Sequence, residues 1–228
     1  MEPIARISTN IEGKFGIPRQ SGVVQGLKGV IQFEKPYRNQ DALRGLEDFS
    51  HIWLIWQFSE SVLKPGEFRP LVRPPRLGGN HSMGVFATRS PFRPNSLGMT
   101  VVKIEGIDLE SKGGPFIHVS GVDLMDGTPI YDIKPYIPYC DCIPDAEKGF
   151  TGEAERIPLT VEDPKNCTAV FSEENRGELL EILKNDPRPA YHNDPERIYG
   201  IIYCGKDVRF RIDGHTLTVY SVDEKGSR

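Results

Sequence analysis

The stretch Gly78-Gly-Asn-His-Ser-Met-Gly-Val-Phe-Ala-Thr88 decides between two fold classes. Its glycines suggest a loop that binds phosphate, but a dinucleotide-binding fingerprint must follow a strand and open a helix. Here the glycines lead into residues 83–88, which predict a strand because they combine valine and phenylalanine with small residues. The order of elements therefore argues against a Rossmann-type domain, and the Walker A pattern is absent as well.

Similar short apolar segments recur on both sides of this stretch, separated by clusters of Gly and Pro. They cover residues 4–7, 23–33, 51–58, 99–107 and 116–125. Many short strands with turn signals between them favour an antiparallel sheet closed into a barrel. One short helix is expected among them at Asn39–Glu47, where an asparagine cap precedes leucines at helical spacing. The predicted fold class is mainly β, with a single-sheet antiparallel barrel over residues 1–150.

The last third of the chain predicts a second, smaller unit. Residues 129–164 are rich in Pro, Tyr and Asp without sustained periodicity, so they are expected to form an ordered loop system. An amphipathic helix is predicted over 174–185, and Asp186-Pro187 should end it. Strands are predicted at 198–204, 208–212 and 217–222, with Asp213-Gly214 as a hairpin turn. Together they indicate a small α+β domain over residues 165–228.

Composition limits the classes of function. The 228 residues contain 38% hydrophobic residues and carry a formal net charge of −4, which argues against a globally basic nucleic-acid coat protein. No apolar run approaches the roughly 20 residues of a membrane span, and the first residues lack a signal peptide, so a cytoplasmic protein is expected. Cys140 and Cys142 have no partner pair at zinc-like spacing, so free thiols and no metal are expected.

A local excess of arginine is the strongest functional signal. Between Phe68 and Glu105 the chain has no acidic residue before the last position, yet it carries several cations: Arg69, Arg73, Arg76, Arg89, Arg93 and Lys103. Neighbouring prolines fix the backbone beside several of them. Arginine grips phosphates and carboxylates with a planar fork, so the block predicts a binding site for an anion. The alternative is a solvated loop whose arginines pair with acids from elsewhere.

Three further stretches combine turn residues with groups that could contact a ligand. Asp126-Gly-Thr-Pro129 and Asp132-Ile-Lys-Pro-Tyr136 would place carboxylates and a tyrosine at a barrel rim. Asp186-Pro-Arg-Pro-Ala-Tyr191 holds an arginine and a tyrosine between prolines, which suits a phosphate contact and a stacked base. Ordinary turn chemistry is the alternative for all three.

Seven blocks of the chain, taken in order, resemble the TrmO family of tRNA methyltransferases. They are Pro18-Arg-Gln-Ser-Gly22, Arg44-Gly-Leu-Glu-Asp-Phe-Ser-His-Ile-Trp53, Val72-Arg-Pro-Pro-Arg-Leu-Gly-Gly-Asn80, Gly84-Val-Phe-Ala-Thr-Arg-Ser-Pro-Phe-Arg-Pro-Asn95 and the three stretches just described. The resemblance implies a barrel that binds S-adenosylmethionine, a small C-terminal domain contributing to tRNA binding, and a homodimer. It also implies N6-methylation of the threonylcarbamoyladenosine at position 37, next to the anticodon of threonine tRNA.

The resemblance also implies site residues. The cofactor is expected at Ser21, Gly22, Val23, Ser59, Glu60, Arg89, Met99, Ser120, Gly121, Val122, Asp123 and Leu124, some of them contributed by the partner subunit. Where the family often has His-Gln, this chain has Ser59-Glu60. Substrate contacts are expected at Arg76, Arg93, Asn95, Lys134, Arg188 and Tyr191, with Arg76 or Arg93 gripping the threonine carboxylate.

Methyl transfer to this nitrogen needs alignment of the reacting atoms and a group that accepts the N6 proton. Asp126 or Asp132 is the expected base, and Tyr136 completes the predicted catalytic set. Two other classes of function stay open at this point. A non-catalytic RNA-binding barrel would use the same arginines without a cofactor pocket, and a metal-free hydrolase would need a nucleophile that the sequence does not reveal.

Overall fold

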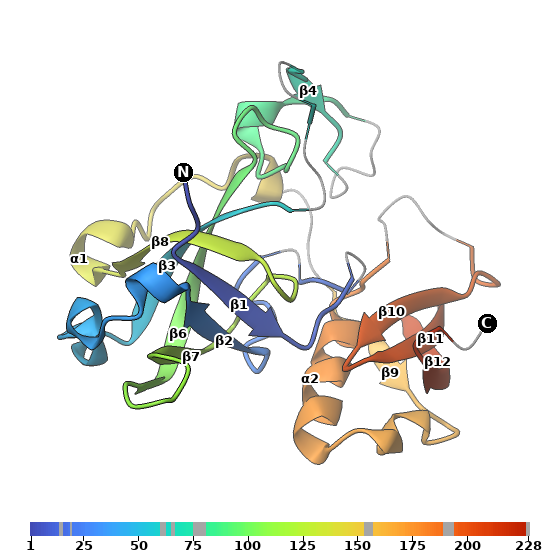
Figure 1. Cartoon of the computed structure of the whole chain (residues 1–228). Helices are drawn as coiled ribbons and strands as arrows, with labels where there is room; N and C mark the ends of the chain where they lie inside the picture. The colour runs from blue at the N-terminus through green and yellow to red at the C-terminus, as the bar shows by residue number, and fades with distance from the viewer. Residues whose placement is uncertain are drawn as a thin grey trace.

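Six strands close into an antiparallel barrel (Figure 1). The computed structural model describes residues 1–13, 16–18, 20–59, 63–64, 67–74, 81–152, 157–188 and 194–226. Around the barrel the strands are β1 (Ala5–Thr9), β2 (Lys28–Phe33), β7 (Phe116–Ser120), β6 (Leu97–Asp108), β3 (His51–Gln57) and β8 (Pro129–Pro135). The pairing of Ala5 with Ile130 joins β1 to β8 and closes the sheet. The predicted fold class is confirmed.

Alternation along β3 explains which residues fill the barrel. Ile52, Leu54 and Trp56 are buried, whereas Trp53 and Ile55 between them are only half-buried. Successive side chains of a strand point to opposite faces, so the first set fills the interior and the second lies on the outer surface. The barrel core is therefore built from the short apolar runs that the sequence displays.

Two strand predictions in this part of the chain need correction. Residues 83–88 form only β5 (Met83–Gly84), which pairs with β4 (Leu71–Val72), and then a 3₁₀ turn over Val85–Ala87. The β4–β5 hairpin stands away from the barrel in Figure 1. Conversely, β8 lies inside the stretch 129–164 that was expected to be loop. Its flanking prolines and its outward polar residues hide the alternation, although a proline is tolerated at the first position of a strand.

The expected helix at 39–47 is two short 3₁₀ turns instead. They are η2 (Gln40–Leu43) and η3 (Leu46–Asp48), preceded by η1 (Lys35–Tyr37). Asn39 caps η2 as expected, because its side chain accepts a hydrogen bond from the backbone N–H of Asp41 at 3.0 Å. Gly45 then adopts φ 84°, a left-handed conformation that ends one turn before the next begins.

The C-terminal unit is a four-stranded sheet with one longer helix. Its elements are β9 (Thr160–Glu162), η7 (Cys167–Val170), α2 (Glu173–Lys184), β10 (Tyr199–Tyr203), β11 (Lys206–Asp213) and β12 (Thr216–Glu224), and the connection from the barrel holds α1 (Pro138–Asp141) and η6 (Gly149–Gly152). The predicted helix and three strands are confirmed, whereas β9, which pairs parallel with β12, was not foreseen. The turn lies one residue later than predicted, at Gly214-His215, because Asp213 pairs with Thr216.

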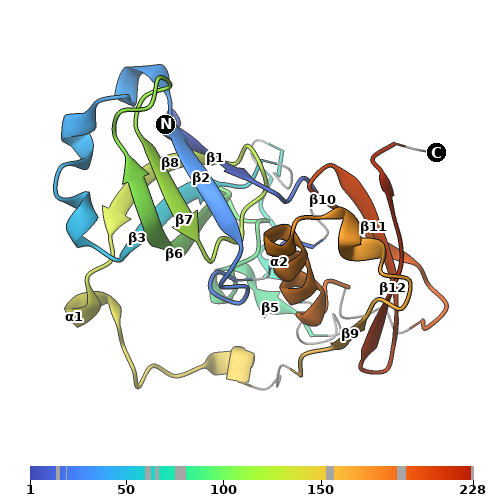
Figure 2. The same cartoon turned by 90° about the horizontal axis from the view of Figure 1, so that it is seen from below.

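The two units share a buried joint. In Figure 2 α2 lies between the barrel and the C-terminal sheet. Glu178 of α2 is buried and accepts hydrogen bonds from the Tyr203 hydroxyl at 2.8 Å and from Asn10 Nδ2 at 3.3 Å. Ile11 forms an isolated bridge with Tyr203, and the buried apolar residues of both units form one continuous cluster. Among the described helices none has the length and apolar character needed to cross a membrane.

Candidate functional site

A hollow lies where β3 ends and β6 begins. Its volume is about 580 Å³, and its wall is formed by residues 17, 18, 20, 55, 56, 58, 59, 88, 89, 91, 93, 97–100, 123–125 and 128. Trp56, Phe58, Leu97, Met99 and Leu124 make much of the wall apolar. Cavities of roughly 300–1,000 Å³ with apolar walls and a few polar groups are typical of small-molecule sites.

Register between β3 and β6 shapes the floor of this hollow. Trp56 pairs with Gly98, and a Cβ atom at Gly98 would lie 2.3 Å from the Trp56 ring, so only glycine leaves room for the indole. Trp56 Nε1 donates a hydrogen bond to Thr100 Oγ1 at 3.0 Å. The Thr100 hydroxyl in turn donates to Asp123 Oδ1 at 2.8 Å. Packing inside the barrel thus fixes the orientation of a carboxylate in the hollow.

Asp123 has a perturbed protonation equilibrium. Burial raises the pKa of Asp123 to about 6, because removal from water disfavours the charged form. Hydrogen bonds from Thr100 and from the backbone N–H of Asp123 and Ser21, together with the positive charge of Arg89, act in the opposite direction. The result is a carboxyl group that changes charge close to neutral pH.

A second, smaller hollow adjoins the first. Its volume is about 460 Å³, and Arg89 and Met99 line both hollows. Its remaining wall contains three rings on the outer face of the barrel: the Tyr136 ring lies 5.9 Å from the Trp53 ring and 6.3 Å from the His51 ring. Trp53 Nε1 donates to Asp141 Oδ2 at 3.0 Å, which holds the indole in place.

Two loops bring distant parts of the chain to this place. The backbone N–H of Gly22 donates to the carbonyl of Gly121 at 3.0 Å, so the segment around residue 21 lies beside the segment that follows β7. Both glycines have positive φ, 71° and 75°, a conformation that side chains rarely adopt. The tight approach presents Ser21 and Asp123 to the hollows.

Six of the residues expected at the cofactor line the two hollows. Ser59, Arg89, Met99, Asp123 and Leu124 line the larger hollow, and Ser21 lines the smaller one together with Arg89 and Met99.

The other described residues expected at the cofactor are not among those that line the two hollows. Val122 belongs to the core, Val23 packs against it, and Ser120 donates to Glu105 Oε1 at 2.5 Å. Gly22 and Gly121 contribute the loop contact described above, and Glu60 lies outside the described residues.

Of the expected catalytic residues, only Tyr136 lines a hollow. Asp126 accepts hydrogen bonds from the Ser8 hydroxyl at 2.9 Å and from the Thr9 backbone N–H at 3.0 Å, an arrangement that stabilises the turn beside β1. Asp132 forms an ion pair with Lys134 Nζ at 3.0 Å, on the outer face of β8. Neither carboxylate is among the residues that line the two hollows.

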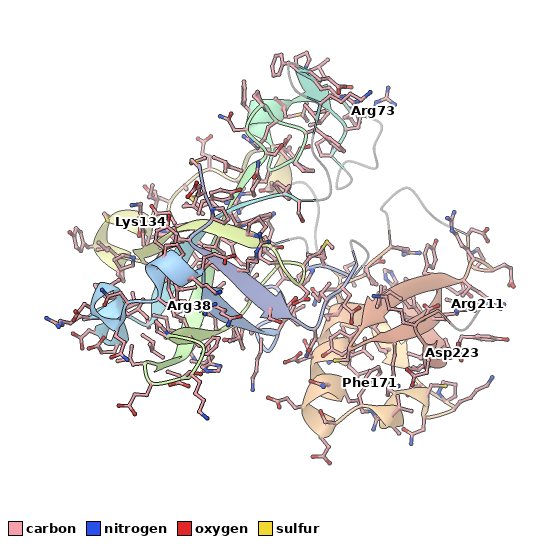
Figure 3. The ribbon with its side chains drawn as sticks, in the orientation of Figure 1. Arg38, Arg73, Lys134, Phe171, Arg211 and Asp223 are labelled. Carbon is pink, nitrogen blue, oxygen red and sulfur yellow. The ribbon has the colours of Figure 1, made fainter. Side chains whose placement is uncertain are left out.

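Some arginines of the block make contacts with residues of their own loops. Arg93 lines the larger hollow, and its Nη1 donates to the Thr88 carbonyl at 2.9 Å. Arg69 pairs with Glu67 at 2.7 Å, which fits the alternative of a locally neutralised loop. Arg73 is exposed on the β4–β5 hairpin, on the upper part of Figure 3.

The expected substrate contacts are spread over the molecule. Asn95 is exposed, Lys134 lies on the barrel, and Arg188 Nε lies 3.0 Å from Asp186 Oδ2 in the C-terminal unit. Arg76 and Tyr191 lie outside the described residues. The geometry therefore brings the expected cofactor residues together more closely than the expected substrate contacts.

Three residues that line one or other of the hollows are missing from the sequence-based prediction of the site. They are Trp53 in the smaller hollow and Trp56 and Thr100 in the larger one. Within the described residues there is no group of three or more His, Cys, Asp or Glu side chains placed to hold a metal ion. All four cysteines are free thiols.

Comparisons with known proteins agree with this architecture. Residues 6–142 match a family described as the tRNA-methyltransferase O N-terminal domain, and residues 166–225 match the TrmO C-terminal domain. A tRNA (adenine(37)-N6)-methyltransferase of Escherichia coli K12 is 37% identical over 239 residues, covering 98% of this chain and 97% of its own. A Pseudomonas aeruginosa protein, RcsF, whose name assigns it to the S-adenosylmethionine-dependent methyltransferases, is 40% identical over 219 residues, covering 92% and 91%.

A solved structure is similar over nearly the whole length. A crystal structure of TrmO from Pseudomonas aeruginosa superposes with a TM-score of 0.77 at 32% identity, covering 98% of this chain and 95% of that one. The barrel, the C-terminal sheet and the connection between them therefore recur together in a known protein.

Proposed function

Since the chain belongs to the tRNA-methyltransferase O family, we propose that it methylates N6 of threonylcarbamoyladenosine at position 37 of threonine tRNA. As a family member it is an S-adenosylmethionine-dependent methyltransferase that acts on tRNA. The observation that carries the finer proposal is the pair of adjoining hollows, which share Arg89 and Met99. Two reactants held in neighbouring hollows can meet at a shared wall, as an in-line displacement requires.

The larger hollow fits the methyl donor. Its apolar wall of Trp56, Phe58 and Leu97 suits an adenosine and the methylene groups beside a sulfonium, and the Asp123 carboxylate offers a negative charge to this cationic ligand. Ser59, Arg89, Met99 and Leu124 complete the proposed donor contacts. When bound, S-adenosylmethionine supplies an electrophilic methyl group.

The smaller hollow fits the target nucleoside. Unpaired bases of RNA are recognised by stacking on aromatic side chains, and Trp53, Tyr136 and His51 offer such rings. Arg93, which lines the larger hollow, is our candidate for the threonine carboxylate, with Asn95 two positions further along the chain. Lys134 on the barrel and Arg188 in the C-terminal unit are candidates for the phosphates of the anticodon loop.

We also propose that two copies of the chain pair and that some donor contacts cross the interface. Apolar side chains around the β4–β5 hairpin support this proposal, since Phe86 is 70% exposed and Leu71 is 61% exposed. Sedimentation at micromolar concentration should give twice the mass of one chain. A mass of one chain under conditions of full activity would contradict the pairing.

A non-catalytic RNA-binding barrel is the competing class. It would use the same rings and arginines, but it would need no donor hollow. Titration calorimetry separates the two classes, because an RNA-binding module should release no heat with S-adenosylmethionine.

The proposed specificity is tested by transfer of a labelled methyl group from S-adenosylmethionine to threonine tRNA prepared with and without the threonylcarbamoyl group. Label should enter only the modified tRNA, because the carboxylate and the acidified N6–H exist only there. Equal labelling of both preparations would contradict the specificity for the modified nucleoside. Absence of label in both, without heat on donor binding, would leave the RNA-binding class.

A further inference from the structure

Asp123 is the one acidic side chain among the described residues that line the larger hollow. It lies close to the wall that the two hollows share, because the backbone N–H of Ser21, a residue that lines the smaller hollow, donates a hydrogen bond to its carboxyl group. Arg89, which also lines both hollows, acts on it electrostatically. A carboxylate close to this shared wall lies next to the place where donor and acceptor must meet.

The orientation of the carboxyl group is fixed from two sides. Thr100 donates to Oδ1 at 2.8 Å and is itself held by Trp56 Nε1 at 3.0 Å. The backbone N–H of Ser21 donates to the same carboxyl group from the loop beside Gly121. A group held by packed neighbours keeps the geometry that proton transfer needs.

The proposed reaction requires a proton acceptor. N6 of threonylcarbamoyladenosine carries one hydrogen, and the methylated product carries none. Asp126 and Asp132 are occupied by a turn and by Lys134, and neither lines the hollows. Resting on the function proposed above, we propose that the Asp123 carboxylate accepts the N6 proton during methyl transfer.

The step is balanced in atoms and electrons. The N6–H bond breaks and its proton passes to a carboxylate oxygen of Asp123, while its electron pair remains on N6. N6 forms a bond to the methyl carbon as the bond from sulfur to that carbon breaks, and this pair of electrons stays on sulfur. The products are the N6-methylated nucleoside, S-adenosylhomocysteine and a protonated Asp123, which then releases its proton to water.

The electrostatic surroundings suit this role. The pKa of Asp123 is raised to about 6, near the value at which a general base is both ionised and basic at neutral pH. Arg89 is the charged side chain that acts on it, whereas β3, β6 and the loop at residue 21 contribute Trp56, Thr100 and Ser21, which do not titrate here. Transfer should therefore fall as the pH drops below about 6, because the base becomes protonated.

The test compares the intact protein with its Asp123→Asn variant in single-turnover methyl transfer, with saturating S-adenosylmethionine and threonylcarbamoylated threonine tRNA. The rate of the variant should fall by roughly 10²- to 10⁴-fold, the usual contribution of general base catalysis. Its residual rate should lose the acidic limb of the pH profile. Donor affinity should weaken, because the amide offers no charge to the cationic donor, and the saturating donor concentration removes this difference from the rate. A cooperative urea unfolding transition shows that the variant is folded.

A carboxylate-to-amide change far from the hollows serves as the matched control. Asp108→Asn, at the opposite end of β6 from Leu97, should retain the rate and the pH profile. A wild-type rate for Asp123→Asn once the donor is saturating would overturn the inference and return the role to Asp126 or Asp132. No transfer by the unaltered protein would instead contradict the proposed function.

Discussion

At the scale of single residues, Thr100 connects the barrel interior to the proposed base. Replacing Thr100 by Val removes a hydrogen bond to a charged carboxylate while keeping the shape of the side chain. Loss of this bond disfavours ionisation, so the pKa of Asp123 should rise further. Hydrogen bonds to charged groups contribute about 1.5–3 kcal/mol, so the acidic limb should move upward by about one pH unit or more. The measurement is the pH profile of single-turnover transfer.

Thr100→Ser is the matched control for that experiment, since it keeps the hydroxyl and should keep the midpoint of the profile. An unmoved midpoint in Thr100→Val would mean that another group titrates. The sequence alone could not predict this chain of contacts, because Trp56, Thr100 and Asp123 are separated by 44 and 23 positions. From the sequence, Asp123 is expected only as a cofactor contact in a segment that resembles the family. Asp126 or Asp132 is expected to act as the base.

At the scale of elements, the close pairing of β3 with β6 is the feature most sensitive to change. A methyl group at position 98 would overlap the Trp56 ring, so Gly98→Ala should displace the indole and loosen the hydrogen bond to Thr100. Overpacking of a filled core costs about 1–3 kcal/mol. Urea unfolding should show this loss of stability, and methyl transfer should slow as well.

Gly106→Ala provides the comparison within the same strand, because nothing lies within 4 Å of a Cβ atom there. Its free energy of unfolding should change by less than about 0.5 kcal/mol, as is usual at unconstrained surface sites. Equal losses in both variants would mean that β6 tolerates no side chain at any glycine. That result would contradict a specific contact with Trp56.

The elements differ in how well their sequences predict them. The strands β2, β3, β6 and β7 and the helix α2 were predicted because apolar residues follow one period and turn residues bound them. The strand β8 was missed because prolines flank it. Residues 83–88 were predicted as one strand from their local preference, but tertiary contacts decide their path, and only Met83–Gly84 form a strand. A closed barrel was predicted nevertheless, since it depends on the number and spacing of short strands.

At the scale of the whole molecule, Glu178 lies in the joint between the two units. Burial raises the pKa of Glu178, so the folded state holds the proton more tightly than the unfolded chain. This contribution to stability is complete below the unfolded pKa and is lost as the pH rises through the folded pKa. Glu178→Gln keeps an acceptor for Tyr203 without the charge, so it should raise the free energy of unfolding at pH 8, where the intact protein carries this buried charge.

Glu181→Gln on the same helix is the control, because its ion pair with Lys184 is exposed and exposed pairs contribute little. Urea unfolding at pH 5 and pH 8 should show a smaller pH dependence for Glu178→Gln and no such change for Glu181→Gln. A large loss of stability in Glu178→Gln at both pH values would mean that the charge itself holds the joint. The division into units at 1–150 and 165–228 remains a prediction, and the sequence offered no sign of a joint whose partners, Asn10 and Glu178, are 168 positions apart.

The location of the transferred methyl group tests the central claim most directly. Threonylcarbamoylated threonine tRNA would be incubated with the protein and with S-adenosylmethionine that carries a deuterated methyl group, and its nucleosides would be analysed by fragment mass spectrometry. The account predicts one labelled methyl group on N6 of the modified adenosine at position 37 and none on any other nucleoside. Label on another atom or another nucleoside would contradict the assignment of the two hollows to donor and modified adenosine.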